Sequence, residues 1–375
     1  MSCKYVPIGT TLPLTGIFSA FGKTGLWAYQ LAAQETNAKG GLRIDASPKK
    51  IPVKLFFMDD GSRPEQASEN IKKLIYEFQV CIILGGWATP LVIEEAKTCS
   101  KLKVPLVAAG SGDPLLDDEE FKWVFIPHVG IDGHSKPFFE FLNSLDPKDR
   151  PNKIGIWIEN TNVGRASGEI WRADANRYGY QIACQYTFKE QNDNAKLIKE
   201  TKDNGADFVF AIFSPKQGIF AMRESKRINF NPKMFAFIRA AVSHDFAKEL
   251  GLDSDYVTMA GTWGPMIKCP ESREIVKRYL LEKGEYPSCD LGPFFAVAQI
   301  ALNAISRAGT SDKEKIREAL SLTDMTTVVG PIKFPRGFGH AEVRLVLNQW
   351  QQGILHTVWP ENVASAKIIY PKPPW

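Results

Sequence analysis

Two segments of this 375-residue chain combine glycine and hydroxyl residues at the ends of expected strands, where a ligand could be bound. They read Gly85-Gly86-Trp87-Ala88-Thr89 and Ala109-Gly110-Ser111-Gly112, and each follows a short apolar run. Pro90 opens a helical pattern directly after the first segment. A helix N-terminus presents backbone N–H groups and a positive dipole end, which favour a negatively charged group. The helix that begins near Pro90 therefore offers a favourable dipole for an anion, and tight turns between strand and helix are the alternative for both segments.

Motifs for other chemistries fail on spacing. Residues 16–24 (GIFSAFGKT) resemble a phosphate-binding loop, but five residues separate their glycines where that motif has four. Gly110-Ser111-Gly112 fits neither the dinucleotide-binding nor the nucleophile-elbow pattern. The six cysteines lack zinc spacing, and the histidines stand apart from nucleophile motifs. His128 and His134 could bind a metal, with a structural role as the alternative. We therefore expect no enzyme, no cofactor and no metal site.

The composition is that of an ordinary globular protein. Lys and Arg number 46 against 42 Asp and Glu, so the net charge is +4, and 44% of residues are hydrophobic. These values exclude a disordered or fibrous chain. The lysines are scattered, which gives no support for a nucleic-acid partner. No apolar run approaches the roughly 18–20 residues of a membrane-spanning helix.

The first 126 residues alternate between strand and helix, which is typical of a parallel sheet covered by helices on both faces. Strands are expected at 6–12, 53–58, 81–84, 105–108 and 123–126, and helices at 22–37, from Pro64 to Phe78 and at 90–102. In the Pro64 helix, Ala67, Ile71, Leu74, Ile75 and Phe78 form one apolar stripe. A doubly wound α/β unit follows from this pattern.

A second alternating block begins at Lys153. Its strands are expected at 154–158, 182–187, 207–212, 233–237 and 257–261, and its helices at 164–178, 193–204 and 215–228. Three helices follow at 271–283, 290–308 and 312–320, and then β segments at 332–334, 342–350 and 353–359. Helices without intervening strands make no parallel sheet of their own, so we expect these three to return and pack on the first unit. The chain is thus predicted to cross between two lobes more than once.

Several separated motifs carry a family resemblance. They are residues 8–16 (IGTTLPLTG), Phe21-Gly22, Asn37-Ala38-Lys39-Gly40-Gly41, Asp59-Asp60, Pro64, Leu74-Ile75, Gly85-Gly86, Val104-Pro105-Leu106-Val107, Gly330-Pro331-Ile332-Lys333-Phe334 and the hairpin end at 353–360. In these motifs and their order, nearly the whole chain resembles the periplasmic solute-binding proteins of ABC transporters, of the branched-chain amino acid (leucine/isoleucine/valine-binding) type.

The resemblance implies an α/β fold of two doubly wound Rossmann-like lobes, the type I periplasmic binding protein fold, joined by three hinge crossovers. The N-terminal lobe would hold residues 1–128 plus 264–330, and the C-terminal lobe residues 129–263 plus 331–375. The crossovers would lie near residues 128–132, 262–265 and 330–335. Ligand would bind in the cleft between the lobes by hinge closure, in line with the general rule that open α/β sheets bind ligands at the carboxyl ends of their strands.

The resemblance also implies site residues in the first lobe. The two glycine-containing loops would hold the ligand carboxylate through Trp87, Ala88, Thr89, Gly110, Ser111 and Gly112. Phe21 matches an aromatic position that packs on the ligand, and core packing is its alternative. His128 and Asp132 lie at the first crossover, where the family has polar ligand contacts, and a structural hinge role is the alternative for both.

The match weakens in the second lobe. In the loop around Asn162, Val163 replaces the family's Tyr before Gly164. The amino-acid binders place a carboxylate after the strand that here ends at Phe237, to pair with the ligand ammonium, whereas this chain has Arg239. Arginine cannot pair with an ammonium, but it can grip a carboxylate with two hydrogen bonds. A solvated surface arginine is the alternative.

Aromatic residues at the expected cleft positions complete the prediction. They are Phe18, Phe21, Trp87, Phe213 and Trp263. The ligand is therefore expected to be an aromatic carboxylate, with a branched-chain or other apolar amino acid as the alternative. The protein would be a non-enzymatic, monomeric binding component that delivers its ligand to the membrane permease subunits of an ABC transporter. A ligand-sensing regulatory module of the same fold is the rival from another class.

The first residues and the cysteines bear on compartment. Met1-Ser2-Cys3-Lys4 runs almost directly into a strand without a charged-then-apolar leader. A periplasmic or membrane-anchored extracellular protein whose leader has been removed is expected, and a cytosolic chain is the alternative. Cys3 is then a candidate lipoprotein acceptor or an ordinary residue. Cys269 and Cys289 bracket one helical segment, and both a disulfide and two thiols stay open.

Overall fold

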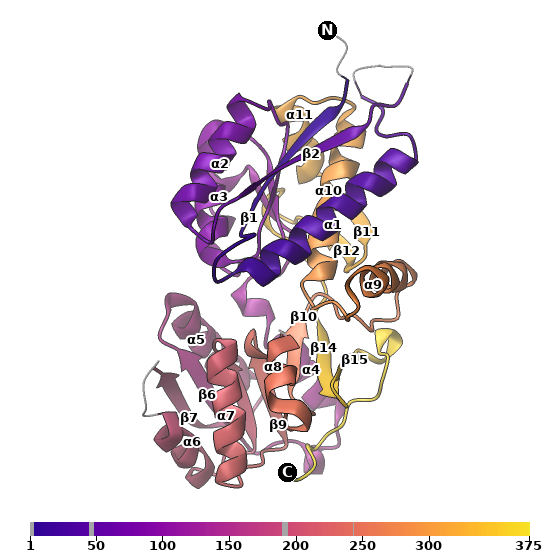
Figure 1. Ribbon diagram of the computed structural model, residues 1–375. Helices are drawn as coiled ribbons and strands as arrows, with labels where there is room; N and C mark the ends of the chain where they lie inside the picture. The colour runs from indigo at the N-terminus through magenta and orange to yellow at the C-terminus, as the bar shows by residue number, and fades with distance from the viewer. Residues whose placement is uncertain (1–3, 45–48, 190–193, 243) are drawn as a thin grey trace. The chain divides into compact units, whose positions relative to one another are not determined.

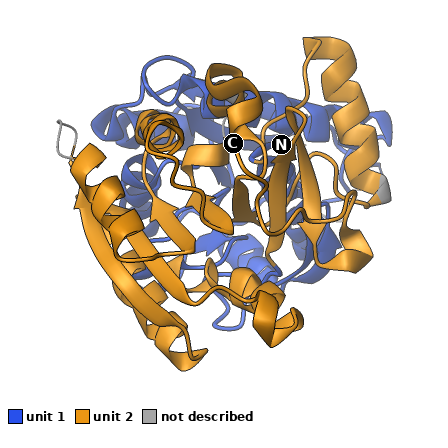
Figure 2. Ribbon diagram, turned by 90° about the horizontal axis from the view of Figure 1, so that it is seen from below, with its two compact units in different colours: residues 1–130, 290–344 blue, residues 131–289, 345–375 orange. Residues whose placement is uncertain are grey.

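The computed structural model describes residues 4–44, 49–189, 194–242 and 244–375. The chain divides into two compact units, which Figure 2 colours separately. Unit 1 holds residues 1–130 and 290–344, and unit 2 holds residues 131–289 and 345–375. The chain therefore passes between the units three times, as predicted.

Unit 1 contains a six-stranded sheet in the order β13-β5-β4-β3-β1-β2, with all neighbours parallel. The strands are β1 (Val6–Leu12), β2 (Val53–Asp59), β3 (Ile83–Gly85), β4 (Leu106–Ala108), β5 (Val124–Ile126) and β13 (Gly339–His340). The helices are α1 (Ser19–Ala38), α2 (Pro64–Tyr76), α3 (Thr89–Leu102), α10 (Leu291–Ala308) and α11 (Lys313–Ser321). Helix α2 packs beside α3, and α10 packs against both α1 and α11 (Figure 1). A separate hairpin joins β11 (Asp324–Thr327) to β12 (Gly330–Lys333).

The apolar stripe predicted for α2 is confirmed for four of its five residues. Ala67, Ile71, Leu74 and Ile75 are buried, and the last three lie in the unit 1 core. Phe78 lies beyond the end of α2 and is 38% exposed, with its ring 4.8 Å from that of Phe56. The helix ends two residues before Phe78, so this side chain leaves the stripe.

Unit 2 contains a seven-stranded sheet in the order β15-β14-β10-β9-β8-β6-β7. The strands are β6 (Lys153–Glu159), β7 (Gln181–Phe188), β8 (Phe208–Ile212), β9 (Met234–Ile238), β10 (Thr258–Gly261), β14 (Val346–Gln351) and β15 (Ile354–Trp359). The first five are parallel, and β14 and β15 add an antiparallel edge. The helices are α4 (Lys136–Ser144), α5 (Asn162–Arg177), α6 (Asn194–Asp203), α7 (Pro215–Arg227), α8 (His244–Leu250) and α9 (Pro270–Lys283).

Two unit boundaries lie further along the chain than the sequence predicted. Contacts inside unit 2 hold residues 264–289 there, because the Trp263 indole donates to Ser272 Oγ at 2.9 Å and the Lys268 N–H donates to the Val363 carbonyl at 3.0 Å. Helix α9 therefore belongs to unit 2, whereas α10 and α11 return to unit 1 as expected. Residues 331–344 stay in unit 1, because β13 pairs with β5.

Three expectations concern the chain's compartment: the absence of a membrane span, the state of Cys269 and Cys289, and the role of Cys3. Among the described residues, no helix has the length and apolar character that a membrane span requires. Cys269 and Cys289 are thiols: Cys269 Sγ lies 3.1 Å from Glu271 Oε2, and Cys289 is buried in the core of unit 2. Cys3 lies outside the described residues.

Candidate ligand-binding site

The two glycine-containing loops of unit 1 lie side by side. Strands β3 and β4 are parallel neighbours in which Gly85 stands opposite Ala108, and the Ala109 N–H donates to the Gly86 carbonyl at 2.9 Å. Helix α3 begins at Thr89, with Ala88 before it, so its N-terminus opens at the same edge. The structure thus brings Trp87, Ala88 and Thr89 next to Gly110, Ser111 and Gly112.

The second loop presents unused backbone donors. No described residue accepts a hydrogen bond from the backbone N–H of Gly110, Ser111 or Gly112. The Ser111 hydroxyl accepts from the Asp113 N–H at 3.4 Å. Successive N–H groups without a protein partner, beside a helix N-terminus, are suited to an anion.

Trp87 forms an aromatic wall beside these donors. A Cβ at Gly110 would lie 3.0 Å from Trp87 Cδ2, so the indole packs directly on the Gly110 backbone. The His128 ring stands edge-on to Trp87, with centroids 5.4 Å apart, and Phe294 of α10 lies 6.3 Å away. Trp87 is half-buried and His128 is buried, with His128 Nδ1 3.0 Å from the Val129 carbonyl. The predicted residues Trp87, Gly110 and His128 therefore form one cluster.

A hydrogen-bonded latch fixes the loop after β1. The Asp59 carboxylate accepts from the Leu14 N–H at 2.9 Å and from the Thr15 hydroxyl at 2.7 Å, while the Ser62 hydroxyl donates to the Thr15 carbonyl. Partial burial raises the pKa of Asp59, but these hydrogen bonds outweigh burial and the net effect is a lowered pKa. The latch positions half-buried Phe18 and Phe21 at the carboxyl end of β1.

Two buried side chains that the sequence analysis missed, Tyr29 and Glu95, bind the backbone of the loop at Gly85-Gly86. The Tyr29 hydroxyl donates to the Gly85 carbonyl at 2.6 Å, and Glu95 Oε2 accepts from the Gly86 N–H at 3.2 Å. Complete burial, with a smaller contribution from Asp60, raises the pKa of Glu95 to about 8. Glu95 is therefore a neutral acid at pH 7. Glu95 lies on the apolar face of α3, between Leu91 and Cys99. This helical spacing could have identified it from the sequence as a buried acid.

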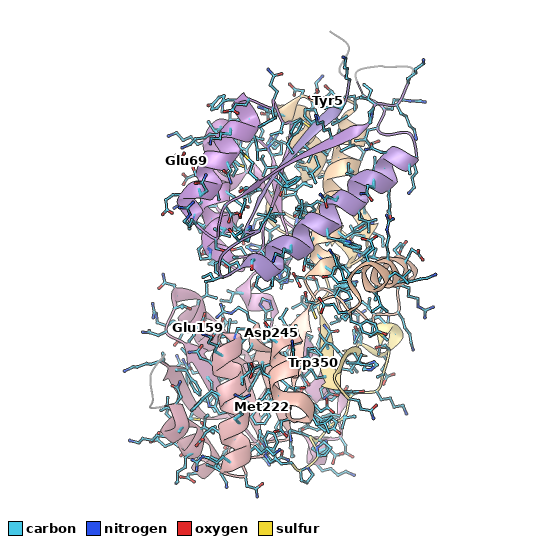
Figure 3. The ribbon with its side chains drawn as sticks, viewed as in Figure 1. Tyr5, Glu69, Glu159, Met222, Asp245 and Trp350 are labelled. Carbon is cyan, nitrogen blue, oxygen red and sulfur yellow. The ribbon has the colours of Figure 1, made fainter. Side chains whose placement is uncertain are left out.

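The carboxyl ends of β6 and β9 in unit 2 carry an ion pair. Arg239 Nη2 donates to Glu159 Oε2, and Glu159 Oε1 accepts from the Thr161 hydroxyl at 2.9 Å. Figure 3 labels Glu159 where β6 ends. The Arg239 side chain is 42% exposed and its backbone is left-handed, with a φ of 71°. The Arg239 guanidinium is thus positioned by its ion pair with Glu159. The sequence analysis missed Glu159, because nothing in the sequence links it to a residue 80 positions away.

The neighbouring predicted residues of unit 2 are less engaged. Asn162 opens α5, is exposed, and accepts from Arg165 Nη2 at 2.6 Å. Val163 is half-buried, and Asp132 is exposed in a short 3-10 turn (Ile131–Gly133). The structure leaves their role in binding a prediction.

Two predicted site residues, Phe213 and Trp263, are fully buried in unit 2. Phe213 is fully buried in the unit 2 core, with its ring 5.1 Å from Phe237 and 5.5 Å from Phe188. Trp263 is also fully buried, and its indole N–H is used by Ser272. Both aromatic side chains pack in the interior of unit 2, and a ligand contact by either stays a prediction.

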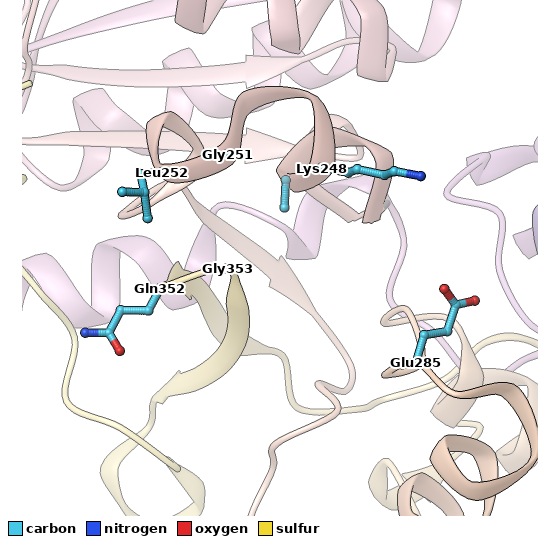
Figure 4. Close-up of a pocket in the computed structure, with 7 residues that line it drawn as sticks. Lys248, Gly251, Leu252, Glu285, Gln352 and Gly353 are labelled. Atoms are coloured by element: carbon cyan, nitrogen blue, oxygen red, sulfur yellow. The ribbon is translucent and has the colours of Figure 1, made fainter.

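A surface depression of about 440 Å³ lies elsewhere in unit 2, between Lys248, Leu252, Glu285 and Gln352 (Figure 4). None of the predicted site residues lines it. Among the described residues, no group of three or more His, Cys, Asp or Glu side chains is placed to hold a metal ion.

Comparison with known proteins identifies the family. A family model described as periplasmic binding protein matches residues 5–353. The Leu/Ile/Val-binding protein homolog 8 of Brucella abortus is 23% identical over 391 residues, covering 98% of this chain and 93% of the relative.

Solved structures share the fold. One is the substrate-binding protein of a branched-chain amino acid transporter from Streptococcus pneumoniae, in complex with isoleucine, at a TM-score of 0.79 and 16% identity over 98% of this chain and 100% of that chain. Another is a solute-binding protein of an ABC transporter from Rhodopseudomonas palustris in complex with 4-hydroxybenzoate, at a TM-score of 0.78 and 16% identity over 99% and 98% of the two chains. With the family model matching most of its length, the chain belongs to the periplasmic binding protein family.

Proposed function

We propose that this protein is the extracytoplasmic solute-binding component of an ABC transporter and that its ligand is a small aromatic carboxylate. The observation that carries the ligand class is Arg239, an arginine held at the carboxyl end of β9 by Glu159. Glu159 takes one hydrogen bond from a guanidinium that has five N–H donors, which leaves donors for a ligand carboxylate.

The loops of unit 1 support the same ligand class. The N–H groups of residues 110–112 offer hydrogen bonds to an anion, and the Trp87 indole offers an aromatic face beside them. Proteins of this fold include one in complex with 4-hydroxybenzoate and one in complex with benzoate. Hinge closure of the two units around the ligand, with Phe21, Thr89 and His128 as further contacts, is part of this proposal.

A branched-chain or other apolar amino acid is the second candidate, and Glu159 favours it. This carboxylate stands at the carboxyl end of β6, where it could accept hydrogen bonds from a ligand ammonium if Arg239 released it. A protein of the same fold is known in complex with isoleucine. The two candidates therefore differ in which member of the ion pair contacts the ligand.

Calorimetric titration with benzoate, 4-hydroxybenzoate, leucine and isoleucine tests both candidates. We expect the aromatic acids to bind, and we expect Arg239→Gln to weaken benzoate binding at least about tenfold, because a charge-assisted hydrogen bond is lost. Glu159→Gln is the matched variant, which keeps Arg239 and is expected to retain benzoate binding.

The opposite pattern would establish the amino-acid candidate. Binding confined to leucine or isoleucine, abolished by Glu159→Gln and little changed by Arg239→Gln, would show that the carboxylate receives an ammonium. Delivery to membrane permease subunits, monomeric state and an anchor at Cys3 are further parts of the proposal. Mass spectrometry of the mature N-terminus checks the anchor directly.

A further inference from the structure

A histidine late in the chain binds the backbone of the second unit 1 loop. His340 lies in β13, and its Nε2 is 2.6 Å from the Ser111 carbonyl oxygen. Its Nδ1 is 3.0 Å from Asp117 Oδ2, and its backbone N–H donates to Asp117 Oδ1 at 2.9 Å. The His340 side chain is only 7% exposed, whereas that of Asp117 is 25% exposed. The ring is therefore fixed between two oxygen atoms.

Both of these oxygens accept hydrogen bonds and cannot donate them. A backbone carbonyl has no proton, and an aspartate carboxylate is an acceptor only. A neutral imidazole has one N–H, so it would turn a lone pair toward one of the two oxygens. Both contacts are satisfied only when both ring nitrogens donate, that is, when His340 is an imidazolium.

The Ser111 carbonyl and the Gly112 N–H belong to one peptide group. That group is planar and trans, so its C=O and N–H point in opposite directions. A hydrogen bond that holds the carbonyl therefore also sets the direction of the Gly112 N–H. A charge-assisted bond to the carbonyl polarises the peptide and makes that N–H a stronger donor.

We propose that His340 is a positioning residue for ligand binding, whose imidazolium aims and polarises the Gly112 N–H and so couples anion binding to its own protonation. This inference rests on the proposed function, in which a ligand carboxylate binds the loop of residues 110–112. No described residue accepts from the Gly112 N–H, so the donor is available.

The direction of the pH effect follows from the charge. Ligand affinity is higher when His340 is protonated than when it is neutral, so raising the pH weakens binding. Several charged groups lie around the His340 ring. Asp117 faces Nδ1, and Arg336 donates to the Asp117 carbonyl at 3.0 Å. Asp113 caps the turn that carries Asp117 (Pro114–Asp117), and β5 contributes only apolar residues. Beyond β13, Glu342 and Lys333 pair through their backbones.

Titration calorimetry with benzoate at pH 5.5 and pH 8.5 tests the coupling, because benzoate stays ionised throughout this range. We expect the parent affinity to fall about tenfold on raising the pH, and the His340→Gln variant to change less than about twofold. Asp117→Asn is the second variant, since an asparagine lets a neutral ring satisfy both contacts, and it should flatten the profile too. His356→Gln, in β15, is the matched control and should keep the parent profile.

Nitrogen-15 NMR on the ligand-free protein separates this inference from the proposed function. We expect both His340 ring nitrogens to be protonated at pH 5.5, and the Gly112 amide resonance to move when the His340 ring loses its proton at higher pH. A His340 ring that is neutral at pH 5.5, or benzoate affinity with the same pH profile in parent and His340→Gln, would overturn the inference. If neither benzoate nor an amino acid binds, the proposed function fails, while the two NMR signals still decide the state of His340.

Discussion

Gly110 matters because it has no side chain where the Trp87 indole lies. An alanine there would place its Cβ 3.0 Å from Trp87 Cδ2 and 3.1 Å from Cε3, closer than the ring tolerates without moving. The backbone itself accepts alanine, since the φ of Gly110 is not positive. The residue therefore controls the position of the aromatic wall.

We predict that Gly110→Ala weakens benzoate binding about tenfold, because a displaced indole no longer stacks beside the anion-binding loop. Calorimetry measures the loss, and tryptophan fluorescence reports the changed ring environment. Gly261→Ala is the control, since its Cβ would meet nothing closer than 3.5 Å. Unchanged benzoate affinity in Gly110→Ala would remove Trp87 from the site.

Individual residues of the candidate site could be proposed from the sequence only where a local pattern marks them. The loops around Trp87 and Ser111 carry glycines after buried strands, and a resemblance in their order identified them. Glu159 and His340 act through partners 80 and 229 positions away, and one sequence holds no information on such distances. Phe213 and Trp263 are fully buried, because an aromatic residue after a strand serves equally well in a core.

Helices α1 and α10 pack closely against each other. Gly25 of α1 faces Phe294 of α10, and a Cβ at residue 25 would lie 2.7 Å from Phe294 Cε1. Phe294 is fully buried and also meets the Tyr29 ring edge-on at 5.7 Å. A glycine within a helix otherwise costs stability relative to alanine, so close packing explains its presence.

We predict that Gly25→Ala lowers the free energy of unfolding of unit 1 by roughly 1–3 kcal/mol, the usual result of overpacking. Urea unfolding followed by hydrogen exchange in α1 and α10 measures it. The double variant with Phe294→Leu should recover part of the loss, because it removes the obstructing ring atoms. A gain of stability in the single variant, as helix propensity alone would give, would contradict the packing argument.

Regular elements were predictable where periodicity is strong. The strand at 6–12 matches β1 exactly in its bounds, and the α2 stripe holds up to Ile75. Helix α4 was missed although Phe138, Phe139, Phe141 and Leu142 are buried, because nine residues give little periodic signal. Strand β13 was missed because two residues have no pattern at all, and only pairing with β5 defines it.

At the scale of the whole molecule, the resemblance predicted two α/β units and three crossings. The structure moves two boundaries because contacts made after the chain leaves a sheet decide which unit a segment joins. The residue types in segments 264–289 and 331–344 do not indicate which of the two units each segment joins. Their partners, such as Ser272 for Trp263, are visible only in the folded chain.

Stability should depend on pH through the buried acid in α3. The pKa of Glu95 is about 8 when folded, against an ordinary value of 4.5, so the folded chain keeps a proton that the unfolded chain releases between these values. The contribution of Glu95 to the free energy of unfolding is fully present below pH 4.5 and is lost as the pH rises toward 8. Asp60, raised to about 6 mainly by burial, acts in the same direction at lower pH.

We predict that raising the pH from 6 to 8 costs the parent about 2–3 kcal/mol more than it costs Glu95→Gln, at 1.36 kcal/mol per pH unit. Chemical unfolding at the two pH values, with hydrogen exchange in α3 and β3, provides the comparison. Glu94→Gln changes a partly exposed neighbour that pairs with Lys97, and it should behave like the parent. Parallel pH curves for parent and Glu95→Gln would show that Glu95 is not protonated in the folded chain.

The order in which the chain builds its two sheets also affects how it folds during synthesis. The unit 1 sheet is complete only when residue 340 has been made, and the unit 2 sheet only when Trp359 has been made. Domains that are continuous in sequence finish folding as they emerge from the ribosome. Here each sheet gains its last edge strand only when translation is nearly finished, so the final backbone pairing of both units forms late in synthesis.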